Sequence, residues 1–383
     1  MDSSDLDPQH TLISAAPCSL HSLETRPVML MSSGSLFLIT FLLCCCGDHD
    51  GSGNAIPDSS SASRASSAPS RDGDEAPGTV ASSASGDVLP AGGTTDLRWK
   101  WSPGETRKYR VLQGYSVIVD DITTTDKVGY EWRLNLKEIN ANGNYVIDAL
   151  IEAVSIEQTQ SLLQMGAVEY NSKDPKKNQP THPITTAYAG LLGRGFTFSM
   201  EPTGRVVEVR GMQKVAERFV QSMGASALFE GKYYQHALGD ESIKQELSRL
   251  FSAVPGKSVA QRETWIHPSS KYFPMMGVVD FSTSFTLSQL KVSGGKKIAD
   301  LLLSSQMTIT QPLEQLHPQP SPLGIGDIEY SKKEENGEEE FLVDEGALKF
   351  RKSKMEISAT VRRSGQSLAL NYVQQTIVEL AED

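Results

Sequence analysis

The side chains with the most distinctive chemistry in this chain of 383 residues are its four cysteines. They lie at Cys18, Cys44, Cys45 and Cys46, so residues 47–383 contain none. A cysteine can form a disulfide, bind zinc as a thiolate or act as a nucleophile. None of these chemistries is therefore available to the segment that follows Cys46.

Four histidines are the remaining candidates for acid–base or metal chemistry in residues 96–383. Three of them precede proline, which favours extended backbone; they are His182, His267 and His317, and the fourth is His236. No pair has a metal-ligand spacing such as His-Glu-x-x-His. The Gly-x-Ser-x-Gly signature of an exposed serine nucleophile is also missing from this part. The sequence thus predicts no catalytic residue, no cofactor and no metal site, and favours a protein that is not an enzyme.

The cysteine triplet directly follows the almost wholly apolar run Leu36–Leu43. Such a run, preceded by the lone Arg26, is too short to cross the roughly 30 Å of a bilayer core comfortably and is typical of a secretory signal. Leu43 and the cysteines after it resemble the bacterial lipobox, in which a cysteine becomes the first mature residue and carries a lipid. The resemblance implies lipid attachment at Cys46, with Cys45 as the alternative, and a membrane-anchored protein of the bacterial cell envelope.

The residues before this run are acidic, although a signal normally begins with positive charge. Asp2, Asp5, Asp7 and Glu24 all lie there. A true start at Met29 or Met31 would remove them. An uncleaved single-span anchor and a plain signal peptide remain alternatives to the lipoprotein signal.

The acidic charge of the chain is concentrated towards its N-terminal end. The formal net charge is -11, and residues 1–95 carry 11 acidic and 3 basic residues. Residues 96–383 carry 36 acidic and 33 basic residues and are nearly neutral. A nucleic-acid-binding domain would show a basic stripe, so we expect no nucleic acid as a partner.

Composition divides the chain into three parts. Residues 51–95 contain 11 Ser, 8 Ala, 7 Gly and 4 Pro, and too few apolar side chains to offset the entropy of ordering. We therefore expect a signal and lipobox region at 1–46, a disordered linker at 47–95 and one β-rich globular domain at 96–383.

Period-two alternation dominates the predicted domain and indicates about ten antiparallel strands. The first strands carry Tyr109 to Val119 and Val128 to Leu136, with a polar turn predicted at Asp120–Lys127. Further turns are predicted where Asn-Gly, Gly-Gly, Ser-Gly or Pro-x-Gly interrupts the alternation. These are Asn142-Gly143, Glu201–Gly204, Gly294-Gly295, Ser364-Gly365 and Asn336-Gly337, the last within the acidic run Glu334–Glu340, read as a solvated hairpin tip.

Only two segments have helical spacing of apolar residues. Met212 to Met223 is closed by Gly224, and the second segment, Ile243 to Val254, follows the N-cap candidate Asp240. The predicted fold is α+β, with a predominantly antiparallel, curved, half-barrel-like sheet and an inserted helical pair. This pattern resembles the half-barrel envelope carriers that hold lipids or lipoproteins.

A more specific resemblance lies in the middle of the chain. Phe198–Gly211 contains Pro-x-Gly-x-Val-x-x-Val-x-Gly, and the second helix leads to Pro255-Gly256-Lys257 and then Trp265. This order resembles bacterial exported lipoproteins of the domain of unknown function 6263 family. The resemblance would cover most of 96–383 and implies no catalytic residues.

These features favour a non-enzymatic binding or structural module of the envelope, with an apolar ligand as one possible cargo. Strand residues 145–156 are apolar on both faces, as in a sheet that encloses a cavity or packs on helices. The alternative is a secreted hydrolase whose site is built from the long polar loops 171–190 and 311–327.

Overall fold

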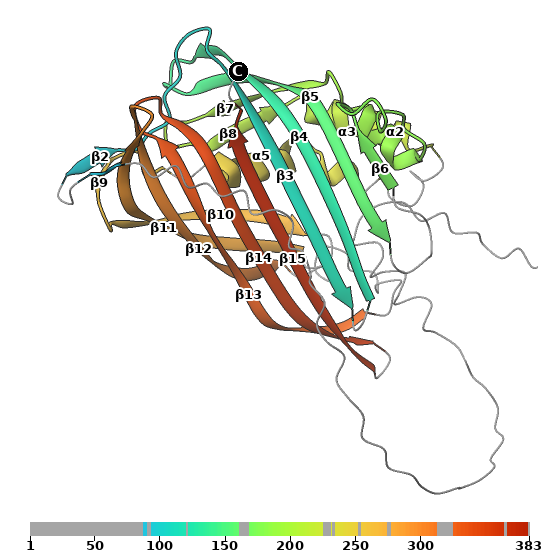
Figure 1. Cartoon of the computed structure of the whole chain (residues 1–383). Coiled ribbons are helices and arrows are strands. Elements are labelled where there is room, and N and C mark those ends of the chain that lie inside the picture. Colours follow the sequence, from blue (N-terminus) through green and yellow to red (C-terminus); the bar gives the residue numbers. More distant parts are fainter. Residues whose placement is uncertain are drawn as a thin grey trace, which may run out of the picture. The chain divides into compact units, whose positions relative to one another are not determined.

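The structure is a computed structural model in which antiparallel strands predominate (Figure 1). It describes residues 87–89, 93–119, 122–160, 168–224, 231, 234–251, 254–273, 277–311, 325–363 and 366–381. The signal, the lipobox cysteines, most of the predicted linker and His317 lie outside these residues. Among the described residues, no helix is long and apolar enough to cross a membrane.

One open sheet of thirteen strands holds most of the described chain, and a separate pair joins β2 to β9. The order is β1-β11-β12-β13-β14-β15-β3-β4-β5-β7-β8, with β10 beside β11 and β6 beside β5. The strands are β1 (Asp87–Val88), β2 (Thr94–Asp96), β3 (Thr106–Val119), β4 (Ile122–Ile139), β5 (Tyr145–Gln160), β6 (Val168–Asn171), β7 (Gly195–Met200), β8 (Val206–Arg210), β9 (Ser258–Ala260), β10 (Thr264–Phe273), β11 (Gly277–Ser293), β12 (Lys296–Gln311), β13 (Ile325–Leu342), β14 (Ala347–Arg363) and β15 (Gln366–Leu380). The prediction of a predominantly antiparallel sheet is confirmed, with more strands than expected; β1 and part of β2 fall in the range predicted as linker.

Three helices are described, and two of them confirm the helical segments predicted from spacing. They are α2 (Pro183–Ala189), α3 (Met212–Ser222) and α5 (Asp240–Phe251). Asp240 does not cap its own helix as predicted. Its carboxylate accepts hydrogen bonds from the backbone N–H groups of Met212 (2.7 Å) and Gln213 (3.2 Å), so it caps α3 instead. This contact ties the start of one helix to the start of the other.

The short helix α2 was not predicted, because the three His-Pro pairs were read as loop residues. Here His182 is the N-cap, and its Nδ1 accepts from the backbone N–H of Ile184 at 3.3 Å. Pro183 occupies the first helical turn, where its missing N–H costs nothing. The sequence 171–190 is therefore not one long loop.

The helix α5 connects the two ends of the sheet. It contacts β8, the last strand of one end, and β10, which lies beside β11 near the other end. Both contacts require the sheet to bend around the helix, and Figure 1 shows α3 and α5 behind β3–β5. Side chains on the inner face of the sheet therefore meet α5.

The turn between β7 and β8 is fixed by a close backbone approach. Gly204 has φ +90, and a Cβ there would lie 1.9 Å from the carbonyl oxygen of Phe251. The same oxygen accepts a 2.7 Å hydrogen bond from the buried indole of Trp99. The Pro-x-Gly sequence of the predicted motif thus allows the β7–β8 turn to pack on the end of α5.

Two predicted turns are wrong. Residues 122–127 belong to β4, so the connection from β3 is much shorter than Asp120–Lys127. Asn336 and Gly337 lie inside β13, which pairs with β12 on one side and β14 on the other. A Cβ at Gly337 would lie 2.3 Å from the carbonyl oxygen of Lys352, so the glycine here permits close strand packing rather than a turn.

Candidate functional site

A cavity of about 290 Å³ lies between the sheet and the helical segments. Strands β3, β4 and β5 supply one wall, and α5 with the helical turn at residues 234–237 supplies another. Phe273 of β10 and Tyr372 of β15 also line it. Most lining side chains are apolar or aromatic, and the volume is close to the lower limit of about 300 Å³ for small-molecule pockets.

The strand wall is apolar over most of its length. Alternate residues of a strand share one face, so paired strands place matching residues side by side. Trp132 of β4 lies opposite Ile151 of β5, and Val128 lies opposite Ile156. Phe196 of β7 meets Trp132 edge-on, with ring centroids 6.4 Å apart. This part of the wall therefore favours contact with an apolar molecule.

One end of the same wall is polar. Tyr115 of β3 pairs with Asp126 of β4, and Asp126 pairs with Gln158 of β5, so the three side chains form a row across three strands; we call them the polar row. All three line the cavity. Asp126 is 7% exposed and Gln158 2% exposed. Within the described part of the chain, the amide oxygen Oε1 of Gln158 has no hydrogen-bond partner.

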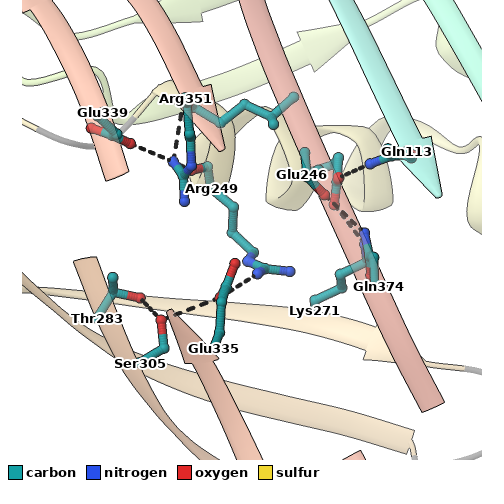
Figure 2. Close-up of polar contacts among 12 residues, drawn as sticks. Gln113, Glu246, Arg249, Lys271, Thr283, Ser305, Glu335, Glu339, Arg351 and Gln374 are labelled. Atoms are coloured by element: carbon teal, nitrogen blue, oxygen red, sulfur yellow. Dashed lines mark hydrogen bonds and ion pairs between the residues drawn. The ribbon is translucent and has the colours of Figure 1, made fainter. Parts of the chain in front are cut away.

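An ion pair between α5 and β10 forms a second polar feature of the lining. Lys271 Nζ lies 2.8 Å from Glu246 Oε2, and Gln113 of β3 donates to Glu246 Oε1 at 2.8 Å (Figure 2). Burial raises the pKa of Glu246, but the positive charges of Lys271 and Arg249 outweigh this effect and lower it to about 2. Glu246 therefore stays ionised, and its charge is balanced within the protein.

Four charged residues lie beyond this ion pair, between α5 and strands β13 and β14, and three of them are buried while the fourth, Arg249, has a side chain that is 11% exposed (Figure 2). Arg249 of α5 lies 2.8 Å from Glu335, and Arg351 of β14 lies 3.0 Å from Glu339. We call these four residues the charged band. Arg351 also donates to the backbone carbonyl of Arg249, near the C-terminal end of α5. The band joins the helix to the sheet.

The two glutamates of the charged band correct the prediction of a solvated hairpin tip. Glu335 is 3% exposed and Glu339 is 1% exposed. They lie four residues apart on one strand, and alternation therefore directs both to the inner face. Ser305 of β12 donates to Glu335 at 3.2 Å and pairs with Thr283 of β11 at 2.8 Å, which extends the polar contacts across two further strands (Figure 2).

Glu339 is less well satisfied than its neighbour. Its ion pair with Arg351 lacks hydrogen-bond geometry, and neither carboxylate oxygen has a hydrogen-bond partner among the described residues. Burial raises the pKa of Glu339 to about 7, against the opposing charge of Arg351 and with a smaller contribution from Glu335. Its protonation state therefore changes near neutral pH.

The central segment of the chain matches a family model. A model described as a family of unknown function (DUF6263) matches residues 142–313. Residues 142–313 belong to the DUF6263 family. The predicted resemblance to this family is thus confirmed for the segment that includes β5 to β12. The DUF6263 segment supplies α5, β5 and β10 to the cavity, whereas β3, β4 and β15 come from outside it.

Other comparisons add no function. No curated protein matches the chain. Among solved structures, DynF from the dynemicin biosynthesis pathway of Micromonospora chersina is 5% identical and covers 79% of this chain and 92% of its own, with a TM-score of 0.17. OccK5 (OpdH) of Pseudomonas aeruginosa is 7% identical, with coverages of 73% and 99% and a TM-score of 0.17. The MucA/MucB complex of the same organism is 7% identical and covers 71% of this chain and 89% of its own, with a TM-score of 0.09. TM-scores this low do not establish a shared fold with any of the three structures.

The structure places the described histidines on separate elements. His182 caps α2, His236 is exposed in the helical turn at 234–237, and His267 lies on β10 within the DUF6263 segment. Burial lowers the pKa of both His182 and His267. Among the described residues, no three His, Cys, Asp or Glu side chains are grouped as a metal site would require. Residues 312–324 of the second predicted loop lie outside the described ranges.

The polar residues of the cavity were not predicted as a site, because they are far apart in the chain. One local signal was present for Asp126. It precedes Val128, Tyr130 and Trp132 at period two, so extending the predicted strand by one step would have placed it on the same face. Gln158 similarly follows Ile156. The pairing of the two across β4 and β5 depends on the register of the sheet.

Proposed function

We propose that this domain is a half-barrel that binds a small apolar molecule between its sheet and α5. The observation that carries the proposal is the cavity of about 290 Å³, with its apolar strand wall around Trp132 and Ile151. Both sheet ends reach α5, as an incomplete barrel closed by a helix would require. The buried area available to an apolar ligand provides the driving force, at about 25 cal/mol per Å² of apolar surface removed from water.

Binding can be tested with the neutral fluorescent dye Nile red, whose emission rises in apolar surroundings. Ala237 lines the cavity, and Ala237→Phe would place a ring inside it. We expect the variant to bind the dye at least about tenfold more weakly, a change of about 1.4 kcal/mol. Ala369→Phe makes the same substitution on an exposed strand position and should leave dye binding unchanged. Equal binding by natural protein and Ala237→Phe would place the dye elsewhere and overturn the proposal.

We further propose that a lipid on Cys46, or on Cys45, anchors the domain to a membrane of the bacterial cell envelope. The lipobox-like order of Leu43 and the cysteines supports this, as does the Ser- and Gly-rich segment after them, which suits a flexible tether. Replacing Cys44, Cys45 and Cys46 together by serine should release a folded domain from membranes. Retention of that triple variant after a carbonate wash would contradict the lipid anchor and favour a membrane-spanning segment.

A further inference from the structure

The polar row contains a buried acceptor that the described protein residues leave unsatisfied. Gln158 is 2% exposed, lines the cavity and has no hydrogen-bond partner for Oε1. An unsatisfied buried polar group is costly. Asp126 lies directly across from it on β4 and adds the acceptor oxygens of its carboxyl group. A ligand group that donates hydrogen bonds would satisfy this end of the cavity.

The other charged lining residues do not compete for such a group. Lys271 and Glu246 are paired with each other at 2.8 Å, and Gln113 occupies the second oxygen of Glu246. The lysine is therefore already matched and is not available to an anionic ligand without breaking this ion pair. The lining holds two acidic side chains, Asp126 and Glu246, against the single lysine. An anionic head group would meet net repulsion here.

We propose that the molecule bound in the cavity is an amphiphile with a hydrogen-bond-donating head, an alcohol or a protonated amine. A protonated amine donates both to Gln158 Oε1 and to the Asp126 carboxyl group, whereas an alcohol donates its single O–H to Gln158 Oε1. The apolar body lies along β4 and β5 towards Trp132 and Ile151, which are six and seven residues away on the same two strands. This inference rests on the proposed function and specifies its ligand class and orientation.

Four eight-carbon probes separate the contribution of the head from that of the chain. They are 1-octanol, octylamine, octanoate and 1-methoxyheptane, an isomer of octanol that has no O–H to donate. Each is titrated at pH 7 against bound Nile red. We expect octanol and octylamine to displace the dye at concentrations at least about tenfold lower than octanoate and methoxyheptane.

Gln158→Met tests the amide directly, because it keeps the length of the side chain and removes the acceptor. In natural protein, octanol should displace the dye at a lower concentration than methoxyheptane does. The ratio of these two concentrations should fall at least about fivefold in the variant, a change of about 1 kcal/mol. Gln375→Met, on an exposed position of β15, should leave the ratio of displacing concentrations unchanged. A thermal melt confirms that both variants are folded.

The outcomes distinguish the two proposals. If Nile red binds in the cavity but all four probes displace it equally, or octanoate displaces it best, the donor-head inference is overturned and the apolar site stands. An octanol preference that survives Gln158→Met also overturns it. If the dye fails to bind, or binds Ala237→Phe equally, the proposed function itself fails and the inference with it.

Discussion

Strands β13 and β14 bury charged side chains that pair with one another or with α5, whereas β4 and β5 bury a carboxyl group and an amide against a cavity. On the first wall, Arg249 faces Glu335 and Arg351 faces Glu339. On the second, Gln158 Oε1 has no partner in the described chain. The two walls belong to one sheet and follow the same alternation, so their difference lies in what each polar group meets.

This difference separates structural from ligand-facing polar groups. Buried charges are stable only with a partner, and removing one partner leaves the other uncompensated. In the charged band, Glu335 has Arg249 as its partner, and Glu339 has Arg351 as an ion-pair partner although neither oxygen of Glu339 makes a hydrogen bond among the described residues. The band joins α5 to the sheet. In the polar row, by contrast, the amide oxygen of Gln158 has no hydrogen-bond partner among the described residues. A bound ligand that donates a hydrogen bond would supply that partner. The two walls should therefore respond differently to substitution.

The largest effect is expected from Arg249→Met, which leaves Glu335 buried at 3% exposure without its guanidinium. We expect a loss of about 3–5 kcal/mol in the free energy of unfolding, measured by urea denaturation. Removing the carboxylate as well, in Arg249→Met/Glu335→Leu, should recover most of the loss. Arg218→Met, on an exposed position of α3, should change stability by less than about 0.5 kcal/mol. A loss of unfolding free energy in Arg249→Met no larger than that of Arg218→Met would show that the charged band does not stabilise the fold.

The next largest effect is a pH dependence of the free energy of unfolding, caused by the titration of Glu339. Because burial raises its pKa from 4.5 to about 7, the folded state favours the protonated form. The resulting stabilisation is complete below pH 4.5 and is lost as the pH rises through 7.

The amide in Glu339→Gln does not titrate, so comparing this variant with the natural protein isolates the contribution of the Glu339 carboxyl group to stability. Its stability relative to the natural protein should rise by about 2 kcal/mol between pH 5 and pH 8, since each pKa unit corresponds to about 1.4 kcal/mol. Urea denaturation at both pH values provides the measurement. Taking the difference removes the opposite contributions of Glu246 and Glu335, whose pKa values are lowered. A pH-independent difference would assign the titration to another group.

Much of the fold was predictable, but its polar interior was not. Asn142-Gly143 and Asn336-Gly337 carry the same local signal, yet only the first makes a turn, with Gly143 at φ +77. Gly337 lies in a strand paired on both sides, and that pairing overrides the dipeptide. The acidic run around it looks solvated in sequence because the partners of Glu335 and Glu339 come from α5 and β14.

The smallest effect is expected from Gln158→Met in the absence of ligand, where the two walls should differ most clearly. Its amide oxygen makes no hydrogen bond among the described residues, so the substitution removes no partner and buries no new polar group. We expect the free energy of unfolding to change by less than about 1 kcal/mol, or to rise, since an unsatisfied buried amide is itself destabilising. Urea denaturation alongside Gln375→Met measures this. A loss above about 2 kcal/mol would show that Gln158, like Glu335, has a structural partner within the protein. The buried polar groups of both walls would then be structural.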